Sequence, residues 1–403
     1  MRVLIASQYF TPEIHAPSAR LHAFAQGLAA RGHAIEVICE IPSHPSGVVA
    51  PGYGGRLVDR RRVDGFVAGY VWVYATPSKS ARARIANYAS YAATAVLAGA
   101  ARPRPDVILA SSPPLSVGSV GATLALRYRV PWVFDVRDLW PDAAVALGQI
   151  GEGRFLRMAQ RLERRLYRSA AAITVTTEPT RRDVEGRGGG GKVTVIPNGT
   201  TPIFIDVGAE PPEPSLLGES DGRFTWTYAG NLGLVSGLET ALDAARELGD
   251  GFRLVLVGAG PRRGELERIA AELPTGTVTF LDPVPPAEAA RMMRASDALL
   301  VSRAPVPALD GMVLSKLYDS CAVGRPVIVS AAGETHRLAV EAEAALCVSP
   351  GDAGELAAGL RRLRDDASLG ERLAGNARAF AMANLRERGV ERLEQVLDAA
   401  AAE

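Results

Sequence analysis

The sequence predicts an α/β protein with two domains. Short apolar segments rich in β-branched residues alternate with helical patterns along the chain, which is typical of parallel sheets covered by helices on both faces. A strand, helix and strand pattern begins at "VLIAS" and again, about halfway along the chain, at "FTWTYAG". The 403 residues, of which 47% are hydrophobic, are enough for two cores. We therefore predict two Rossmann-like domains in tandem.

The first domain is predicted to begin with the strand "VLIAS" and an amphipathic helix that ends at Gly32. The residues on the apolar face of this helix are Leu21, Phe24, Ala25 and Leu28. Later strands are expected in "RGHAIEVIC", "DVILAS", "PWVFDV", "AAITVTT" and "KVTVIPNG". The prolines at both ends of 197–202 predict a linker, so we place this domain at residues 1–200.

The second domain, placed at residues 201–379, starts with the strand "FTWTYAG" and a helix over 237–248. Its further strands are expected in "FRLVLVG", "VTFLD", "ALLVS", "RPVIVS" and "ALCVSP". The last helix, at about 380–403, is expected to pack back on the first domain. Because sites in open α/β sheets lie beyond the carboxyl ends of the strands, we expect the two domains to face each other across a cleft.

Charge and cysteine content limit the classes of function. The 45 basic residues nearly balance the 44 acidic ones, so a nucleic-acid partner is not expected. The three cysteines show neither CxxC nor zinc-ligand spacing, and the first residues lack the pattern of a signal peptide. These observations favour a cytoplasmic protein with free thiols. The sequence contains no cluster of His and Cys residues and no DxD pair, so a metal ion is not expected.

Two predicted strand ends in the second domain carry candidate ligand-binding residues. In "WTYAGNLGLVSGLETALDAA", Gly230, Gly233 and Gly237 allow the backbone to approach an anion, although a tight turn alone would also require glycine. In "VPALDGMVLSKLYDSCAVGRPVI", Lys316 and Asp319 lie three residues apart on one helix face. The lysine would neutralise a phosphate and the aspartate would bind ribose hydroxyls. An exposed ion pair is the alternative.

A third cluster follows a predicted strand of the first domain, in "FDVRDLWP". Asp135, Arg137 and Asp138 stand where a buried strand ends, and charged groups are costly to bury without partners. The cluster therefore indicates either a functional site with charged side chains at a cleft or a structural salt bridge.

Taken together, these segments resemble family 4 of the retaining, nucleotide-sugar-dependent glycosyltransferases, which have the fold called GT-B. The likeness includes "YFTPEIHAPSAR", "VIPNG", "YAGNLG", "LVLVGAGPRR" and "SKLYDSCAVGRPVIVS". Within the family, "SSPPLSVG" and "FDVRDLWPDAAVALGQI" look most like the branch that includes the N-acetyl-L-fucosamine transferases of surface-polysaccharide assembly. The resemblance implies transfer of a sugar from a nucleoside diphosphate to a hydroxyl with retention of configuration, without a metal ion or other cofactor.

The resemblance also implies roles for particular residues. On the donor side it selects Gly230, Asn231, Ser236, Gly258, Gly260, Val284, Gly311, Met312, Val313, Leu314 and Asp319. Asn231 and Ser236 stand where many members have an arginine and a lysine, and Gly311 stands where many have a glutamate. The glycine-rich turn therefore offers only backbone amides and neutral donors. The backbone amides of 311–314 are expected to contact phosphate or sugar.

The remaining expected roles concern the reacting groups. Lys316 would hold the departing diphosphate, Arg137 would bind donor sugar or phosphate, and Asp138 would orient groups at the reacting centre. His15 and Ala16 occupy the acceptor-side loop. Because no positioned nucleophile and base are evident, catalysis would consist chiefly of positioning and stabilisation of the leaving group.

The resemblance implies a UDP-linked donor and a lipid-linked or small-molecule acceptor. The segment from Lys79 through the uncharged 85–101 is too short to span a bilayer, and either lies on anionic lipid at the inner face of the membrane or packs on the sheet. Two other functions remain open. One is a natural-product glycosyltransferase acting on a soluble aglycone, and the other is a non-catalytic, nucleotide-binding partner subunit.

Overall fold

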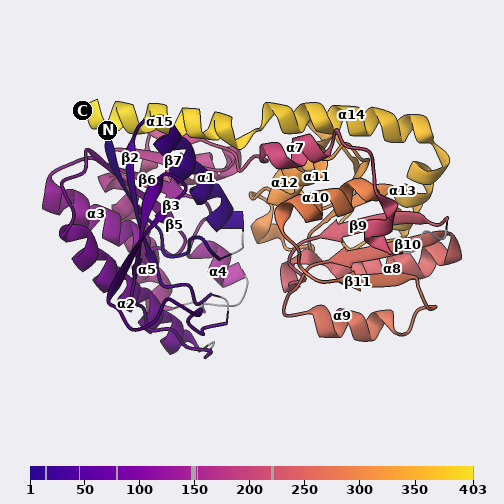
Figure 1. Ribbon diagram of the computed structural model, residues 1–403, viewed down its shortest axis with the longest axis horizontal. Coiled ribbons are helices and arrows are strands. Elements are labelled where there is room, and N and C mark those ends of the chain that lie inside the picture. The colour runs from indigo at the N-terminus through magenta and orange to yellow at the C-terminus, as the bar shows by residue number, and fades with distance from the viewer. Residues whose placement is uncertain are drawn as a thin grey trace. The chain divides into compact units, whose positions relative to one another are not determined.

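A computed structural model describes residues 1–13, 16–44, 46–78, 80–146, 151, 153–218 and 222–402. The chain folds into two compact units, each a mainly parallel sheet with helices on both faces (Figure 1). Unit 1 consists of Met1–Pro197 and Arg386–Glu403, and unit 2 consists of Asn198–Leu385. The predicted fold class, two Rossmann-like α/β domains, is confirmed.

The sheet of unit 1 has the strand order β3-β4-β2-β1-β5-β6-β7-β8. Its strands are β1 (Arg2–Ala6), β2 (Ala34–Glu40), β3 (Val58–Val63), β4 (Phe66–Val71), β5 (Val107–Ser112), β6 (Trp132–Val136), β7 (Ala172–Val175) and β8 (Val193–Val195). All neighbouring pairs are parallel except β3 and β4. The central strands are buried on both faces, which explains why their sequences are continuous apolar runs.

The antiparallel hairpin of β3 and β4 is absent from the sequence prediction. Its turn consists of Asp64, with φ of 40°, and Gly65, with φ of 90°. A turn with two positive φ values matches the right-handed twist of a hairpin and favours an Asp-Gly pair. The Asp64-Gly65 dipeptide is therefore the feature of the sequence that indicates this hairpin.

The helices of unit 1 are α1 (Ala16–Ala30), α2 (Ala81–Ala100), α3 (Ser116–Tyr128), α4 (Asp142–Ala146), α5 (Arg154–Ser169), α6 (Glu178–Val184) and α15 (Arg386–Ala402). The chain moves one way from β1 to β2 and the other way from β5 to β7, so right-handed crossovers place α1 opposite α3 and α5. Helix α15 packs against α1 and the strands β5 to β7, as predicted for the last helix. Gly27 of α1 permits this contact, because a Cβ atom there would lie 2.7 Å from a Val390 methyl group.

Helix α2 contains most of the segment considered for membrane contact. It buries Tyr91, Ala95 and Ala98, and Gly99 allows it to lie against Leu124 of α3, so the packed-helix alternative describes this segment. Lys79 lies outside the described residues. Within the described ranges, every helix is too short or too polar to cross a bilayer.

The sheet of unit 2 has the order β11-β10-β9-β12-β13-β14, and all its neighbours are parallel. Its strands are β9 (Phe224–Ala229), β10 (Phe252–Val257), β11 (Val278–Leu281), β12 (Ala298–Ser302), β13 (Val327–Ser330) and β14 (Leu346–Val348). Its helices are α7 (Pro202–Val207), α8 (Leu238–Leu248), α9 (Arg263–Ala270), α10 (Pro286–Ala295), α11 (Ser315–Ala322), α12 (Gly333–Glu341), α13 (Ala353–Asp365) and α14 (Ala367–Ala383). The strand order reverses direction between β9 and β12, which is where α/β sheets bind ligands at their carboxyl edge.

Candidate functional site

The glycine-rich turn after β9 lies against the turn that follows β10. A Cβ atom at Gly258 would overlap the carbonyl oxygen of Gly230, and one at Gly260 would overlap the backbone of Leu232. The amide of Gly230 donates to the Val257 carbonyl at 2.8 Å. Gly258 and Gly260, both expected near the nucleotide, are therefore required for close packing between two backbones.

Lys316, the second residue of α11, extends to this turn. A Cβ atom at Gly230 would lie 2.5 Å from the lysine Nζ and closer still to its Cε, so only glycine leaves room for the side chain. The Nζ atom lies 5.2 Å from the centre of the Tyr228 ring. Within the described part of the chain, the ammonium forms no ion pair or hydrogen bond. The structure thus places a positive charge at the turn whose own side chains are neutral.

The neutral side chains of the turn differ in exposure. Ser236 is 6% exposed, and its hydroxyl donates to the carbonyl of Asn231 at 2.8 Å. The hydroxyl of Tyr228 lies 2.9 Å from both groups. Ser236 therefore closes the turn from inside, whereas Asn231 and the apolar Leu234 present their side chains at the surface. This corrects the expectation that Ser236 offers a hydroxyl to the donor.

A buried arginine at the end of β12 organises the loop 307–314. Arg303 is 3% exposed, and its Nη1 donates to the carbonyls of Leu309 and Met312 at 2.7 and 3.1 Å. Its Nη2 donates to the Ala332 carbonyl at 2.7 Å and pairs with the Asp310 carboxylate at 3.4 Å. Because one guanidinium satisfies three carbonyls, the loop has a defined conformation beside the start of α11.

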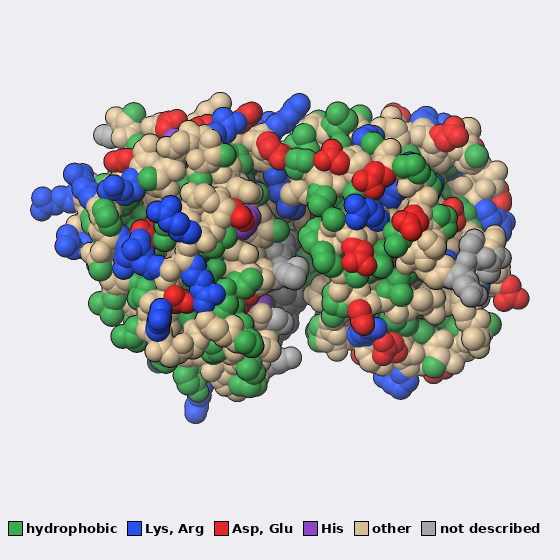
Figure 2. All heavy atoms as spheres, viewed as in Figure 1, with side chains coloured by type: hydrophobic (Ala, Val, Ile, Leu, Met, Phe, Trp, Pro, Cys, Tyr) green, Lys and Arg blue, Asp and Glu red, His purple; other side chains and the backbone are tan. Residues whose placement is uncertain are grey.

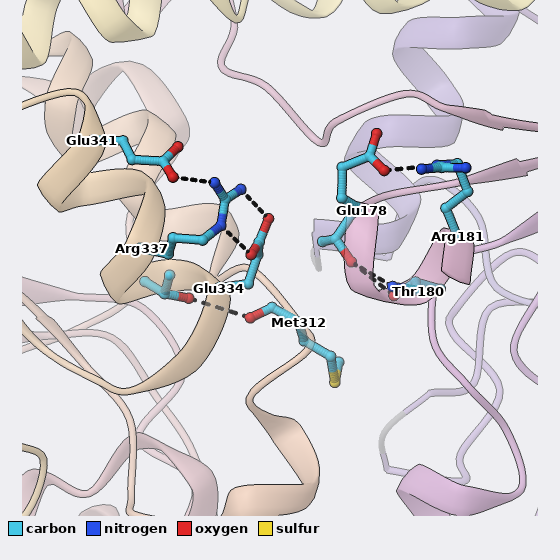
Figure 3. A network of polar contacts seen from close by, with 9 residues as sticks. Glu178, Thr180, Arg181, Met312, Glu334, Arg337 and Glu341 are labelled. Atoms are coloured by element: carbon cyan, nitrogen blue, oxygen red, sulfur yellow. Dashed lines mark hydrogen bonds and ion pairs between the residues drawn. The ribbon is translucent and has the colours of Figure 1, made fainter. Parts of the chain in front are cut away.

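The amides of this loop are only partly available to a ligand. The Met312 amide donates to the Leu309 carbonyl, and the Leu314 amide donates to the Thr335 hydroxyl at 3.1 Å. That hydroxyl in turn donates to the Met312 carbonyl at 3.3 Å. Figure 3 shows Met312 in the same polar network as Glu334 and Arg337 of α12, which form an ion pair. The expectation that all four amides of 311–314 contact the donor is therefore corrected for Met312 and Leu314. In the described chain, the Val313 amide has no protein acceptor.

Asp319 and Val284 complete the expected donor side. Oδ1 of Asp319 accepts a hydrogen bond from the hydroxyl of Thr200 at 2.8 Å, and Thr200 is fully buried. Asp319 is half-buried and lies on α11 with Lys316, one turn further from the start of the helix. Val284 follows β11 and packs its side chain on a small core that includes Val255. Its contribution to a site would therefore come from its backbone.

In unit 1, the charged cluster after β6 divides into two parts. The Asp135 carboxylate accepts hydrogen bonds from Ser111 at 2.6 Å and Thr174 at 2.8 Å, and lies 3.6 Å from the guanidinium of Arg20. Asp135 and Arg20 are both buried, and Arg20 also donates to the Pro197 carbonyl at 2.7 Å. Asp135 therefore has the structural role considered for this cluster.

Arg137 and Asp138 differ from Asp135 because their polar groups are not all satisfied within the protein. Arg137 is 6% exposed, and it donates through Nε to the Ser112 carbonyl and through Nη2 to the Pro113 carbonyl. Its Nη1 is buried without a hydrogen-bond partner in the described structure. Burial lowers the pKa of the Arg137 guanidinium and raises the pKa of the Asp138 carboxyl. Both residues are therefore candidates for ligand contact.

The expected acceptor-side residues are only partly described. His15 lies outside the described residues. Ala16 is the first residue of α1, and the description of this position covers its backbone alone. Neither residue is placed against the other candidate residues.

A buried carboxyl group at the end of β2 did not emerge from the sequence. Glu40 is 3% exposed, and its carboxyl accepts hydrogen bonds from Gln8 at 2.7 Å and from Ser43 at 3.4 Å. Gln8 is fully buried after β1 and also donates to Asn87 at 2.6 Å. Burial raises the pKa of Glu40 to about 8, and the negative charge of Glu13 adds to the effect. Glu40 therefore carries a proton at neutral pH.

Replacing Glu40 with glutamine is expected to reduce the pH dependence of stability. The ordinary pKa of 4.5 applies to the unfolded chain, so between pH 4.5 and about 8 the folded protein holds a proton that the unfolded chain has lost. The stabilising contribution of Glu40 is therefore complete below pH 4.5 and is lost as the pH rises through about 8. One such proton changes the free energy of unfolding by ~1.4 kcal/mol per pH unit. Urea unfolding at several pH values measures the slope, and parallel slopes for Glu40→Gln and the wild type would contradict this role.

Two families match consecutive parts of the chain. Residues 16–199 match the family described as "Glycosyl transferase 4-like domain". Residues 213–380 match the family described as "Glycosyl transferases group 1". The two matches cover most of unit 1 and most of unit 2, including the candidate residues from Arg137 to Asp319.

Relatives and solved structures extend the likeness to the whole chain. The "Putative colanic acid biosynthesis glycosyl transferase WcaI" of Escherichia coli is 26% identical over 384 residues, which is 90% of this chain and 92% of WcaI. Sucrose-phosphate synthase from Thermosynechococcus elongatus aligns with a TM-score of 0.78 at 19% identity, over 100% of this chain and 99% of that one. Anabaena HepE, solved in complex with UDP-glucose, aligns with a TM-score of 0.72 at 19% identity over 100% of both chains. The chain is a glycosyltransferase of the GT4 type, with the GT-B fold.

Proposed function

We propose that this glycosyltransferase transfers a sugar from a UDP-linked donor, with retention of anomeric configuration, to a hydroxyl of a lipid-linked acceptor in surface-polysaccharide assembly. We further propose that the sugar is an N-acetylated hexosamine. The observation that carries the proposal is the ammonium of Lys316 at the Gly230 turn. It lies at the carboxyl edge of unit 2, where the strand order reverses.

Three features of this edge suit a nucleoside diphosphate. The lysine provides a compact positive charge, which a phosphate group binds as a point charge. The first amides of α11 lie beside it and add the partial positive charge of a helix N-terminus. Asp319, one helical turn further along, has a carboxylate suited to the two hydroxyls of a ribose.

The proposed reaction needs few groups from the protein. The bond between C1 of the sugar and the diphosphate oxygen breaks, and a bond between C1 and the acceptor oxygen forms on the same face. The acceptor proton passes to the departing phosphate, so the products are UDP and the glycoside. Lys316 stabilises the negative charge that develops on the leaving group, while the loop held by Arg303 keeps the diphosphate in position.

The choice of sugar and acceptor is supported by the two segments that resemble the N-acetyl-L-fucosamine transferase branch. "SSPPLSVG" and "FDVRDLWPDAAVALGQI" meet in unit 1, where Arg137 donates to the carbonyls of Ser112 and Pro113. The similarity to WcaI, named for colanic acid biosynthesis, agrees with a polysaccharide pathway. HepE was solved with UDP-glucose, which agrees with a uracil nucleotide.

A thermal-shift screen tests the donor. UDP and a UDP-N-acetylhexosamine are expected to raise the melting temperature, whereas GDP and dTDP are not. At a concentration of a hundred times the dissociation constant, a ligand that binds only the folded state stabilises it by ~2.7 kcal/mol, which corresponds to a shift of several degrees. A shift with GDP or dTDP and none with UDP would overturn the proposed donor. Binding of a soluble aglycone with turnover would favour a natural-product glycosyltransferase instead.

A further inference from the structure

Helix α5 exposes large apolar side chains to solvent. Phe155, Met158 and Leu162 are 44%, 65% and 38% exposed, and their spacing of three and four residues places them along one stripe of the helix. The neighbouring face of the helix is buried in unit 1 through Ala159, Leu166 and other residues. The stripe therefore extends the buried apolar face of the helix into solvent.

A row of positive charge runs beside the apolar stripe. Its members, all exposed, are Arg154, Arg157, Arg161, Arg165 and Arg168. In the described part of the chain, none of these side chains forms an ion pair. The acidic residue of the helix, Glu163, is 1% exposed and is engaged by Tyr167 and Arg187. We call the apolar stripe and this arginine row the α5 surface.

The charges of the α5 surface belong to a larger basic area of unit 1. Figure 2 shows Lys and Arg side chains gathered over α3 and α5 on the face turned to the viewer. On α3, Leu126 is 81% exposed and Arg127 is also exposed, as is Arg129 just after the helix. This local excess contrasts with the balanced charge of the whole chain, 45 basic against 44 acidic residues.

The arrangement of apolar and basic side chains favours an anionic membrane surface over a nucleic acid as the partner. A helix that lies in a membrane interface buries an apolar stripe among the acyl chains while arginines at its border contact anionic headgroups. At 16 residues, α5 is about 24 Å long, enough to rest in the plane of a bilayer and too short to cross it. A nucleic acid would pair with the arginines but would leave Phe155, Met158 and Leu162 in water.

The position of α5 in the sheet connects the α5 surface with the candidate site. The helix ends just before β7 begins, and β6 and β7 are parallel, so α5 runs antiparallel to the strands. Its first residues therefore lie at the carboxyl edge of the sheet, where Arg137 and Asp138 follow β6.

We propose that the α5 surface docks unit 1 on an anionic lipid bilayer, with the start of the helix at the same sheet edge as Arg137. This inference rests on the proposed function in assuming a lipid-linked acceptor. It replaces α2 as the expected point of membrane contact, because α2 has only two arginines, both in its first turn, whereas its exposed Leu97 lies near the other end of the helix.

Vesicle flotation of the full chain tests the proposal. The wild type is expected to float with vesicles of equal parts phosphatidylglycerol and phosphatidylcholine, and not with phosphatidylcholine alone. Combining Phe155→Ser, Met158→Ser and Leu162→Ser should abolish flotation, because the inserted stripe is lost. Each of Arg157→Gln, Arg161→Gln and Arg165→Gln should weaken binding about fivefold. The matched control combines Ile85→Ser and Leu97→Ser on α2, which should float as the wild type does.

Melting temperatures and the shift caused by UDP are measured for every variant, so loss of folding or donor binding is distinguished from loss of docking. Equal flotation of the wild type and the triple serine variant would overturn the proposal. The same holds if a short double-stranded RNA binds the wild type and that variant equally well, since this would identify a nucleic-acid surface. A wild type that floats but shows no shift with UDP would contradict the proposed donor and leave the docking inference standing.

Discussion

Replacing Lys316 with alanine is expected to lower turnover by about a hundred- to a thousand-fold, with a smaller loss of donor affinity. The ammonium lies at the Gly230 turn, where the charge of the leaving diphosphate would develop during the reaction. A charged donor fixed in advance is worth ~3 to 4 kcal/mol to the transition state. Because the attraction grows as the leaving group separates, turnover suffers more than binding. Steady-state kinetics with the donor found by thermal shift measures both quantities.

Two further lysine variants sharpen this test. Lys316→Arg should restore little activity, because the lysine Cε lies in contact with Gly230 and leaves no room for a planar guanidinium. Lys192→Ala removes the same charge in unit 1, where the ammonium donates to backbone carbonyls of Arg168 and Ala170. Its turnover should stay within about twofold of the wild type, as expected for a change remote from the reaction. Near-normal turnover of folded Lys316→Ala would remove Lys316 from the mechanism.

Replacing Gly230 with alanine is expected to lower turnover about a hundred-fold by displacing the lysine. The new methyl group would occupy the space of the Lys316 Cε and Nζ, and the φ of 142° at this position disfavours any side chain. Gly249→Ala is the matched control. Its φ of 70° imposes backbone strain as well, but nothing lies within 4 Å of the added methyl group, so only stability should change.

A double-mutant cycle separates displacement of the lysine from general damage to the turn. If Gly230→Ala acts through Lys316, it should lower the turnover of the Lys316→Ala protein by less than about tenfold, because the group that it displaces is already absent. Independent, multiplying effects of the two substitutions would show that the glycine serves only the packing of the turn.

Most strands that could be predicted from the sequence are apolar runs, and they include the half-buried β8, β11 and β14 as well as strands buried on both faces. β10 is fully buried, and its "FRLVLV" is recognisable without any knowledge of its neighbours. β3, with the sequence "VDRRRV", is an edge strand that alternates half-buried and exposed residues, so a search for apolar runs passes over it. The helix tail that joins the first domain was also predictable, because α15 has an apolar stripe that needs a covering surface.

The candidate site was predictable only where one residue type implies a requirement for another. A glycine-rich turn without charge required a cation, and Lys316 is where the structure places one. Ser236 was misjudged because its partner, the Tyr228 hydroxyl, stands eight residues earlier at the end of a strand. Glu40 is the last residue of a buried strand, much as Asp135 lies near the end of one, yet the sequence did not indicate it. Its hydrogen-bond partner Gln8 follows a different strand, so the local sequence does not reveal that the carboxyl group is buried.

The placement of α15 has a consequence for synthesis on the ribosome. Val390, Leu393 and Leu397 belong to the core of unit 1, yet they follow the whole of unit 2 in the chain. Unit 2 is continuous from Asn198 to Leu385, so it can complete its fold as it emerges, whereas the earlier-made sheet of unit 1 waits with the surface for α15 uncovered. Unit 2 can therefore complete its core first, whereas unit 1, although made first, keeps apolar core surface exposed until α15 has been made.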